Sequence, residues 1–330
     1  MSAMTHPAPY EFSREQIEAM IVSNHPWAVE SFRRIPTGKY NTTYEVALRS
    51  DGRRETPRAV ILRIAPADGA GGTFYEIGMM AQEPEIHEIV RRETTIPVAE
   101  ILAHDTSRRV VDRDFLIMEK LAGGALSDFP RLTAALYDRV LEQVGRMLAQ
   151  LHRITRDRYG YLGAHRCMEP QPDWPSAFRV MWNRLIDNIV GVGAYSEQEA
   201  ARLRGLLEQC AGAFERPVPA SLLHMDIWAQ NILVDEQGHV TGIVDWDRGL
   251  WGDPEIEFAV LDYCGISEPA FWRGYGQPRD GSPDAQRRGV FYYLYEAQKY
   301  IVIHIARRHN RASALGYKAQ VLQILSHAFG

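Results

Sequence analysis

Three polar residues in one short stretch of the sequence could hold a metal ion and move a proton. The stretch runs from Leu222 to Asp253 and contains Asp226, Asn231 and Asp245. Carboxylate and amide oxygens are the ligands that Mg²⁺ prefers. Phosphoryl transfer from a nucleotide needs such a set, because an Asp accepts the proton of the acceptor hydroxyl while an Asn and a further Asp hold the metal. The sequence therefore predicts Asp226 as the catalytic base, and Asn231 and Asp245 as ligands of Mg²⁺.

A β-hairpin is predicted to bring these side chains together. The sequence predicts a buried strand from Ile232 to Val234, a turn from Asp235 to Gly238 and an antiparallel return strand from Thr241 to Val244. The three polar side chains then meet at one end of the hairpin. Asp247 would share a face with Asp245 if the strand continued, whereas a turn would separate the two. Asp247 is therefore a candidate contact for the metal or for a substrate.

Each of these residues alone is as typical of a turn or a strand end as of an active site. Their combination is more specific, because the spacing Asp-x-x-x-x-Asn matches the catalytic loop of protein kinases and Asp245 stands where the next strand carries a metal-binding Asp. The loop reads His-Met-Asp, with no Arg before the Asp. The short distance from Asp247 to Asp253 leaves no room for the activation segment of a protein kinase, which disfavours a peptide acceptor.

The sequence HMDIWAQNILVD, followed by GIVDWDRGLWGDPEIEFAVL, resembles the aminoglycoside phosphotransferase and choline kinase-like superfamily. The pattern of that family is roughly His-Gly-Asp, Asn-Ile-Leu, Ile-Asp-Trp or Ile-Asp-Phe, and Gly-Asp-Pro. This chain departs from it at Met225, where glycine is usual, and at Glu257, where Asp is common. The resemblance implies a two-lobed α+β fold like that of protein kinases, with an antiparallel sheet lobe over residues 1–120 and a mainly helical lobe over residues 121–330.

The resemblance places the nucleotide-binding groups in the N-terminal lobe. A loop between the strands predicted from Phe32 to Ile35 and from Thr43 to Leu48 would lie over the phosphates and donate backbone N–H groups and hydroxyls. Its candidate residues are Gly38, Asn41 and Thr42. A further hairpin is predicted between Val110–Val111 and Phe115–Met118, and it leads into a hinge. Backbone groups of the hinge residues Glu119 and Leu121 would hold the purine edge.

Arg63 lies in the strand predicted from Ala59 to Ile64, where the family commonly has a phosphate-binding Lys. An Arg can hold phosphate oxygens in a fork, but it is bulkier than Lys. Glu83, near the start of the following helix, is predicted to pair with Arg63 as the equivalent pair does in kinases. Glu85 and Glu88 are alternatives for that role. Arg63 could also be an ordinary strand residue whose charged end reaches solvent.

Helices are predicted to fill the C-terminal lobe. One runs from Thr133 to Ile154, and another begins near Gly252 and carries Glu257 and Asp262. These two carboxylates are candidates for binding the acceptor, although negative charge is also favoured in a first helical turn. A loop over Trp272–Asp284 is predicted to border the acceptor site.

The composition is that of an ordinary globular chain of 330 residues, which is long enough for two lobes. The formal net charge is −5 and the Lys and Arg residues are scattered, so nucleic acid is not an expected partner. There is no secretory signal pattern, and no apolar run reaches the roughly 18 residues of a membrane span. Cys167, Cys210 and Cys264 are far apart in the sequence, which fits a reducing cytoplasm.

The resemblance implies a kinase that transfers a phosphoryl group from ATP or GTP to a hydroxyl of a small molecule. Inactivation of antibiotics is the best-known activity of the family, so an aminoglycoside-like antibiotic is the leading acceptor. A sugar or an amino-alcohol metabolite is the alternative acceptor. Arg63 in place of Lys leaves open a nucleotide-binding protein with little catalysis. A metal hydrolase built on His224, Asp226 and Asp245 is a third possibility, although it lacks the further His ligands expected of such a site.

Overall fold

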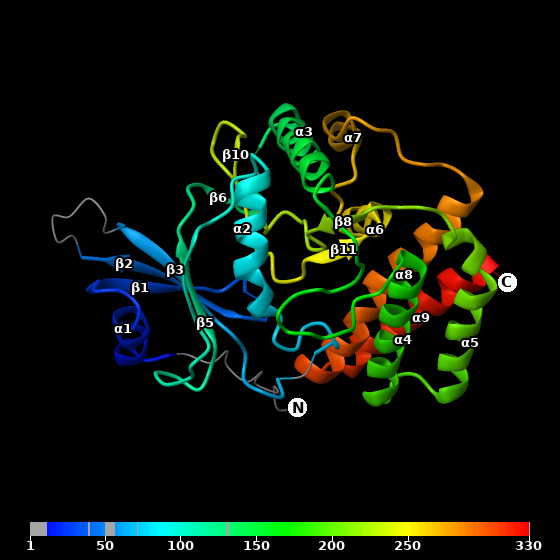
Figure 1. The fold of residues 1–330 in the computed structure, drawn as a ribbon, viewed down its shortest axis with the longest axis horizontal. Helices are drawn as coiled ribbons and strands as arrows, with labels where there is room; N and C mark the ends of the chain where they lie inside the picture. Colours follow the sequence, from blue (N-terminus) through cyan, green and yellow to red (C-terminus); the bar gives the residue numbers. More distant parts are fainter. Residues whose placement is uncertain (1–11, 39, 50–56, 71, 130–131, 330) are drawn as a thin grey trace. The chain divides into compact units, whose positions relative to one another are not determined.

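The computed structural model describes residues 12–38, 40–49, 57–70, 72–129 and 132–329. The chain divides into two compact units, whose elements are labelled in Figure 1. The first unit comprises Met1–Ala70 and Val98–Ala122, and the second unit comprises Gly71–Pro97 and Gly123–Gly330. Residues 71–97 therefore belong to the second unit, together with most of the helices. The lobe boundary between residues 120 and 121 stays a prediction.

The first unit is built on a five-stranded antiparallel sheet in the order β1-β2-β3-β5-β4. Helix α1 (Arg14–Val22) begins with the capping box of Ser13 and Gln16 and buries one apolar face in the core of this unit. The strands are β1 (Val29–Ile35), β2 (Thr42–Leu48), β3 (Ala59–Ile64), β4 (Ile101–Asp105) and β5 (Phe115–Glu119).

One predicted hairpin in this unit is wrong. β5 pairs with β3 and with β4, and not with Val110–Val111. The intervening residues form a closed loop, because Arg108 has a positive φ of 54° and its guanidinium donates to Asp114 over 2.8 Å and to Asp68 over 2.7 Å. The partner of β5 in place of Val110–Val111 is therefore β4, which precedes the loop in the sequence.

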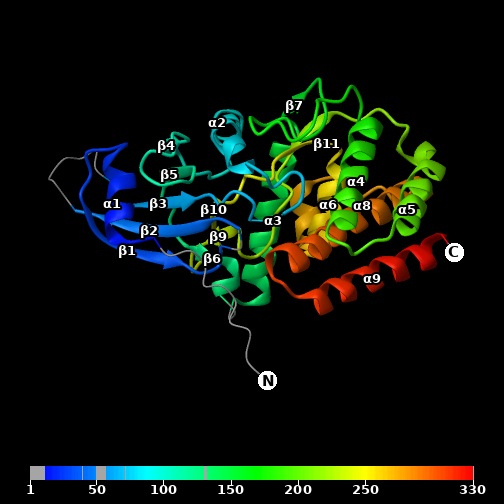
Figure 2. The ribbon, with the colours of Figure 1, turned by 90° about the horizontal axis from the view of Figure 1, so that it is seen from below.

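The second unit is mainly helical and carries two small three-stranded sheets, β10-β9-β6 and β11-β8-β7. Figures 1 and 2 show α8 beside α4 and α6, with α9 packed along α8. Its strands are β6 (Gly124–Ala125), β7 (Thr155–Arg156), β8 (Ala220–Leu223), β9 (Ile232–Val234), β10 (Val240–Ile243) and β11 (Leu250–Gly252). Its α-helices are α2 (Glu83–Glu93), α3 (Ala134–Leu151), α4 (Trp174–Gly191), α5 (Glu197–Gln209), α6 (Pro254–Tyr263), α7 (Pro269–Tyr275), α8 (Pro283–Val302) and α9 (Arg311–Phe329). Its short helical turns are η1 (Met79–Gln82), η2 (Leu126–Asp128), η3 (Ala211–Phe214) and the π-helical turn η4 (Ile303–Arg307).

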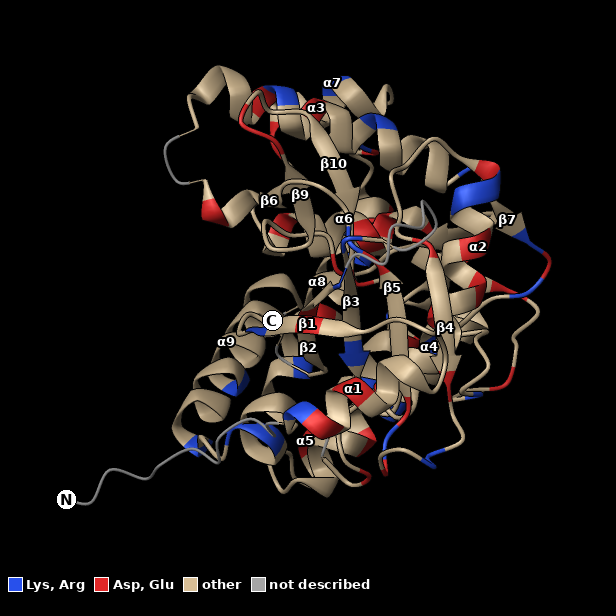
Figure 3. Ribbon diagram, turned by 90° about the vertical axis from the view of Figure 1, so that its left-hand side faces the viewer, with Lys and Arg blue, Asp and Glu red and all other residues tan. Residues whose placement is uncertain are grey.

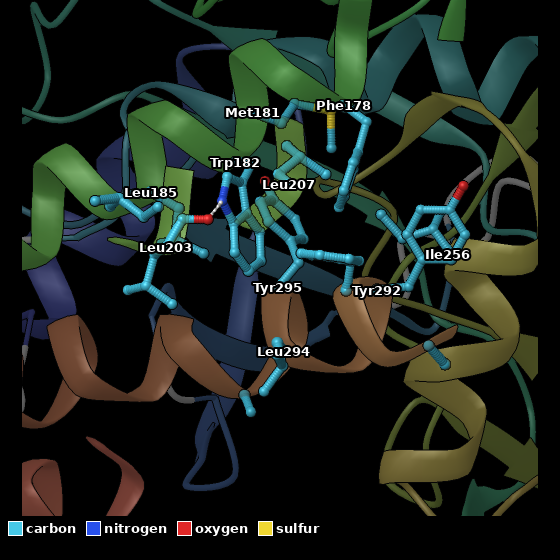
Figure 4. Packing of buried hydrophobic residues seen from close by; sticks show 14 of the residues in the cluster. Phe178, Met181, Trp182, Leu185, Leu203, Leu207, Ile256, Tyr292, Leu294 and Tyr295 are labelled. Atoms are coloured by element: carbon cyan, nitrogen blue, oxygen red, sulfur yellow. Dashed lines mark hydrogen bonds between the residues drawn. The ribbon is translucent and has the colours of Figure 1, made fainter. Parts of the chain in front are cut away.

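Aromatic side chains from α4 and α8 form the centre of the core of the second unit (Figure 4). The rings of Phe178 and Tyr292 meet edge to face with their centroids 5.0 Å apart. The indole N–H of Trp182 donates to the carbonyl of Leu203 in α5 over 3.3 Å, which satisfies its one buried donor. This core fixes α8 and its neighbour α6, and both helices contribute residues to the site described below.

Helix α7 occupies part of the stretch in which a loop was predicted. Pro269 lies in its first turn and Gly276, with a φ of 79°, ends it, so the helical residues reach Tyr275. The helix packs closely on α3, because a Cβ on Gly274 would lie only 1.9 Å from the carbonyl oxygen of Glu142. Only residues 276–282 connect α7 to α8 without helical structure.

In Figure 3, the segments coloured for acidic and for basic residues are interspersed over the ribbon. Within the described part of the chain, every helix is too short or too polar to span a lipid bilayer.

Candidate active site

The loop between β8 and β9, residues 224–231, carries the predicted base and lies wholly in the second unit. The hairpin predicted after it is confirmed, since β9 and β10 are antiparallel with Ile232 opposite Ile243 and Val234 opposite Val240. The main-chain N–H of Val244 donates to the carbonyl of Asn231 over 3.0 Å. The hairpin therefore places the end of the loop beside the residue that precedes Asp245.

Asp226 and Asn231 are joined by direct hydrogen bonds. The side-chain amide of Asn231 donates to Oδ2 of Asp226 and to its main-chain carbonyl, both over 2.9 Å. These bonds use the amide nitrogen, so the side-chain oxygen of Asn231 is the atom left to coordinate a cation. They also leave Oδ1 of Asp226 as the oxygen that can receive a proton.

The surroundings of Asp226 raise its affinity for a proton. Burial raises the pKa of Asp226, Lys299 lowers it, Asp245 raises it again and Arg248 lowers it, and the net shift is upward. A buried carboxylate with a raised pKa is a stronger base than one in water. The arrangement suits a residue that takes a proton from an alcohol.

His224 supports the loop and is not placed to bind metal. The N–H of Asp226 donates to Nδ1 of His224 over 3.2 Å, so Nε2 carries the proton and donates to the carbonyl of Val244 over 3.1 Å. Burial lowers the pKa of His224, which keeps the ring neutral. Both ring nitrogens are thus engaged, which argues against the metal hydrolase alternative.

Three carboxylates cluster near the end of the hairpin. Glu83, Asp245 and Asp247 each place one oxygen within 4.8 Å of the other two. The backbone of Asp245 has a φ of 70°, a conformation that Asp tolerates better than most residues. The side-chain amide of Gln82 donates to the main-chain carbonyl of Asp247. Together with the amide oxygen of Asn231, this is a set of hard oxygen donors of the kind that suits Mg²⁺.

The predicted nucleotide-binding residues other than Glu83 lie in the first unit. Arg63 is on β3, opposite Leu116 of β5, and its side chain is largely buried. A Cβ on Gly38 would lie 2.8 Å from the carbonyl oxygen of Asn41, so the turn before β2 is tight. The remaining three are Thr42 at the start of β2, Glu119 at the end of β5, and Leu121 just beyond it. Their roles in binding a nucleotide stay predictions.

Glu257 lies beneath the 224–231 loop, and we assign it a supporting role in place of the predicted acceptor contact. Its Oε1 accepts the main-chain N–H groups of His224, over 3.0 Å, and Met225, over 2.7 Å. Its Oε2 lies 2.7 Å from Nε2 of His152, whose Nδ1 lies 2.9 Å from the hydroxyl of Tyr275. Glu257 is fully buried and both its oxygens are engaged.

Asp262, the other candidate for the acceptor, lies further along α6. It is partly exposed, and Arg279 donates to both of its oxygens, over 2.9 Å and 2.5 Å. The structure therefore shows Asp262 tied to the segment between α7 and α8, and its contact with an acceptor stays a prediction.

Removal of the Glu257 carboxylate is expected to destabilise the protein. The Glu257→Ala variant leaves two buried N–H groups and His152 without their acceptor, so we expect the free energy of unfolding at pH 7 to fall by about 3 kcal/mol. Burial raises the pKa of Glu257, but the hydrogen bond from His152 and the charges nearby outweigh it, and the pKa is lowered from its ordinary 4.5.

A lowered pKa means that this stabilisation is fully present above pH 4.5 and is lost as the pH falls further. Urea unfolding at several pH values should therefore show a difference between wild type and Glu257→Ala that shrinks in acid. Glu208, whose side chain is about half exposed in a surface pair with Arg179, gives the control, and Glu208→Ala should change stability by less than about 1 kcal/mol. A difference that is constant down to acid pH would contradict the assignment.

Met225 occupies the position where the resembling family has glycine, and its backbone shows why glycine suits it. Its φ is 67°, in the left-handed region, and its side chain is completely buried in the core. A residue other than glycine in this conformation costs about 1–3 kcal/mol. The carbonyl of Met225 accepts a 2.6 Å hydrogen bond from Nη1 of Arg248.

A buried group of charges extends from Arg248 to helix α8. Nη2 of Arg248 lies 2.8 Å from Oε2 of Glu296, and the other oxygen of Glu296 pairs with Lys299. The guanidinium also lies over the ring of Tyr75, 5.2 Å from its centroid. Our sequence interpretation missed these residues, although Glu296 and Lys299, three apart in the largely apolar second half of α8, are an available signal for buried pairing.

The chain is similar to phosphotransferases and to small-molecule kinases. A model of the phosphotransferase enzyme family matches residues 31–289. A probable ketoamine kinase of Vibrio cholerae is 27% identical in an alignment 248 residues long, which covers 66% of this chain and 78% of that protein. The crystal structure of a putative fructosamine-3-kinase from Thermobifida fusca has a TM-score of 0.66 at 18% identity and covers 96% of this chain and 99% of its own.

A thermostable mutant of aminoglycoside phosphotransferase APH(4)-Ia, crystallised with AMP-PNP and hygromycin B, has a TM-score of 0.65 at 17% identity. It covers 94% of this chain and 98% of its own. At these identities the structural likeness bears on the fold, and it confirms the predicted two-lobed α+β fold.

Proposed function

The chain belongs to the phosphotransferase enzyme family and is a small-molecule kinase, and on that premise we propose that it phosphorylates a hydroxyl of an amino-substituted sugar of the ketoamine class. The observation that carries the chemical step is the hydrogen-bonded pair of Asp226 and Asn231 beside the carboxylate cluster. A nucleoside triphosphate, ATP or GTP, is the proposed donor. Its support includes the AMP-PNP bound in the similar APH(4)-Ia structure.

Asp226 is the proposed base of the reaction. The acceptor hydroxyl approaches Oδ1, because Oδ2 is held by Asn231. As the hydroxyl oxygen bonds to the terminal phosphorus, its proton passes to Oδ1 and the bond between that phosphorus and the diphosphate breaks. The products are the phosphorylated sugar, the nucleoside diphosphate and a proton on Asp226, which then passes to solvent.

Asn231 and Asp245 are the proposed metal ligands, with Asp247 and Glu83 close enough to contribute an oxygen. The donor set fits Mg²⁺, since it consists of carboxylate and amide oxygens. When bound there, Mg²⁺ supplies positive charge to the phosphates of the donor. In the first unit, we propose that the donor contacts Arg63, the loop residues Gly38, Asn41 and Thr42, and the backbone at Glu119 and Leu121.

Two observations support the ketoamine class over the antibiotic. The similar Vibrio cholerae protein is named a probable ketoamine kinase and matches this chain over most of its own length. The similar Thermobifida fusca structure is named a putative fructosamine-3-kinase, which also refers to an amino-substituted sugar. Aminoglycosides remain the second candidate, since they too are hydroxylated sugars with amines and a phosphotransferase for one of them shares the fold.

The test is release of ADP or GDP with Mg²⁺ and a panel of acceptors. The panel contains a fructosyl amino acid as the ketoamine, hygromycin B and gentamicin as aminoglycosides, unmodified hexoses, and choline-like alcohols. Turnover with the ketoamine at a kcat/KM at least about tenfold above the hexoses supports the proposal. Turnover with aminoglycosides alone would move the assignment to antibiotic phosphorylation, and nucleotide binding without acceptor-dependent turnover would favour the binding-protein alternative.

A further inference from the structure

Arg248 is buried next to the 224–231 loop and does not belong to the predicted catalytic set. We infer that Arg248, fixed by Glu296, is a positioning residue for Asp226 and acts through the carbonyl of Met225. The inference rests on the proposed function in one respect, namely that Asp226 is the base. The assignment of the guanidinium to the loop stands on contacts within the second unit.

The first step concerns the backbone just before the base. The carbonyl of Met225 and the N–H of Asp226 belong to the same peptide, so a bond to that carbonyl fixes the plane that leads into Asp226. Arg248 makes such a bond, at 2.6 Å. On the other side of Met225, its own N–H donates to Glu257 over 2.7 Å. Two buried charged groups thus hold Met225 from both sides.

The second step concerns the conformation that these groups hold. A non-glycine residue with a φ of 67° persists only where its surroundings over-determine it. The protein-kinase loop has an Arg immediately before its Asp, and this chain has Met225 there. A guanidinium nevertheless reaches the loop, because Arg248 supplies it from the segment between β10 and β11.

The third step concerns what keeps the guanidinium in place. Arg248 is 5% exposed and Glu296 is 1% exposed. One oxygen of Glu296 pairs with Arg248 over 2.8 Å and the other pairs with Lys299, so neither the carboxylate nor the guanidinium can rotate without breaking a buried ion pair. The planar fork of Arg serves the carbonyl and the carboxylate at once, and a Lys in its place has only one nitrogen to offer.

Arg288 provides a matched control elsewhere in the same unit. It is 2% exposed, its Nε and Nη2 donate to Glu255 over 2.7 and 2.9 Å, and its Nη1 donates to a backbone carbonyl, that of Ala213, over 2.6 Å. Arg288 is therefore as little exposed as Arg248 and has the same kinds of partner, although Glu255 is more exposed than Glu296, and its carbonyl partner lies in η3 and not in the 224–231 loop. Loss of either Arg should reduce stability, and only loss of Arg248 should misplace the base.

The experiment compares Arg248→Met, Arg248→Lys and Arg288→Met in the full chain with the acceptor that the wild type uses best. We expect Arg248→Met to lower kcat by about 100-fold and to change KM for the nucleotide by less than about threefold, because a small misplacement of a catalytic group has that effect. Arg248→Lys should recover part of the loss, to within about tenfold of wild type. Arg288→Met should lower the thermal midpoint comparably and keep kcat within about threefold.

Equal loss of kcat in Arg248→Met and Arg288→Met would overturn the inference, as would an Arg248→Lys variant with the kcat of wild type. If Arg248→Met does not fold, the comparison of Arg248→Lys with Arg288→Lys decides. Amide hydrogen exchange separates this inference from the function: Arg248→Lys should accelerate exchange in the 224–231 loop by about tenfold while Arg288→Lys leaves it unchanged, even if the wild type phosphorylates no acceptor in the panel. Unchanged loop exchange in Arg248→Lys would refute it.

Discussion

The Asp226→Asn variant is expected to bind nucleotide and acceptor like the wild type and to lose nearly all turnover. An Asn at this position can still accept the hydrogen bond from Asn231, so the 224–231 loop should keep its shape. An amide cannot take the proton of the acceptor hydroxyl, and general-base catalysis contributes about 10²–10⁴-fold. We therefore expect kcat to fall by about 10³-fold while KM for both substrates changes by less than about threefold. Release of the nucleoside diphosphate measures this directly.

Asp187→Asn is the matched control for the base. Asp187 is exposed on α4, where it pairs with Arg204, and its substitution should leave kcat unchanged. A kcat for Asp226→Asn within about tenfold of wild type would mean that Asp226 orients the hydroxyl without accepting its proton. In that case the hydrogen bond between Asp226 and Asn231 would still be correct, but the role of Asp226 as the base would be wrong.

The Asp245→Asn variant is expected to uncouple the protein from Mg²⁺. Asn tolerates a positive φ as well as Asp does, so the φ of 70° at this position adds no strain. One of three clustered negative charges is removed, which weakens cation binding and lowers their mutual repulsion. We expect kcat at fixed Mg²⁺ to fall by about 10²-fold, and the metal-free protein to be no less stable than the wild type.

The measurement is thermal unfolding titrated with Mg²⁺, with activity assayed in parallel. A cation that binds the folded state alone stabilises it by about 2.7 kcal/mol at 100 times its Kd, so the wild-type midpoint should rise with Mg²⁺. The midpoint of Asp245→Asn should stay flat over the same range. Asp284→Asn, on the exposed start of α8, should follow the wild type. A rise in Asp245→Asn equal to that of the wild type would place the metal elsewhere.

Local patterns were sufficient to predict much of the fold. The strand predicted from Ala59 to Ile64 is β3, and the turn predicted at Asp235 joins the hairpin of β9 and β10, since each is specified by residues a few positions apart. The wrong predictions concern which segments of the chain contact one another in the fold. The sequence from Val110 to Phe115 looks like a hairpin, but β5 pairs with β4 because Arg108 closes the intervening loop. Helix α7 was partly missed because its packing on α3 outweighs its glycine content.

The residues of the candidate site also fall into two groups, those predictable from local spacing and those that depend on tertiary packing. Asp226 and Asn231 could be predicted to lie together because they are five positions apart in one loop. Glu257 was a candidate contact for the acceptor, whereas the structure buries it with both oxygens engaged, and that burial depends on tertiary packing that no pattern on α6 discloses. Arg248 and Glu296 come from distant parts of the sequence and meet only when α8 packs beneath the loop. The candidate reacting groups could be predicted from the sequence, whereas the charges that support the loop could be identified only from the fold.

Met225 also bears on how the loop can evolve. The family pattern has glycine at this position, and a change to glycine would relieve strain of about 1–3 kcal/mol. It would also remove a completely buried methionine side chain, and losing such a side chain costs about 2–5 kcal/mol where the core cannot collapse. The lost packing exceeds the relieved strain over most of these ranges, because the surrounding core packs on the methionine side chain. We therefore expect glycine at this position to be tolerated only together with larger neighbouring core residues.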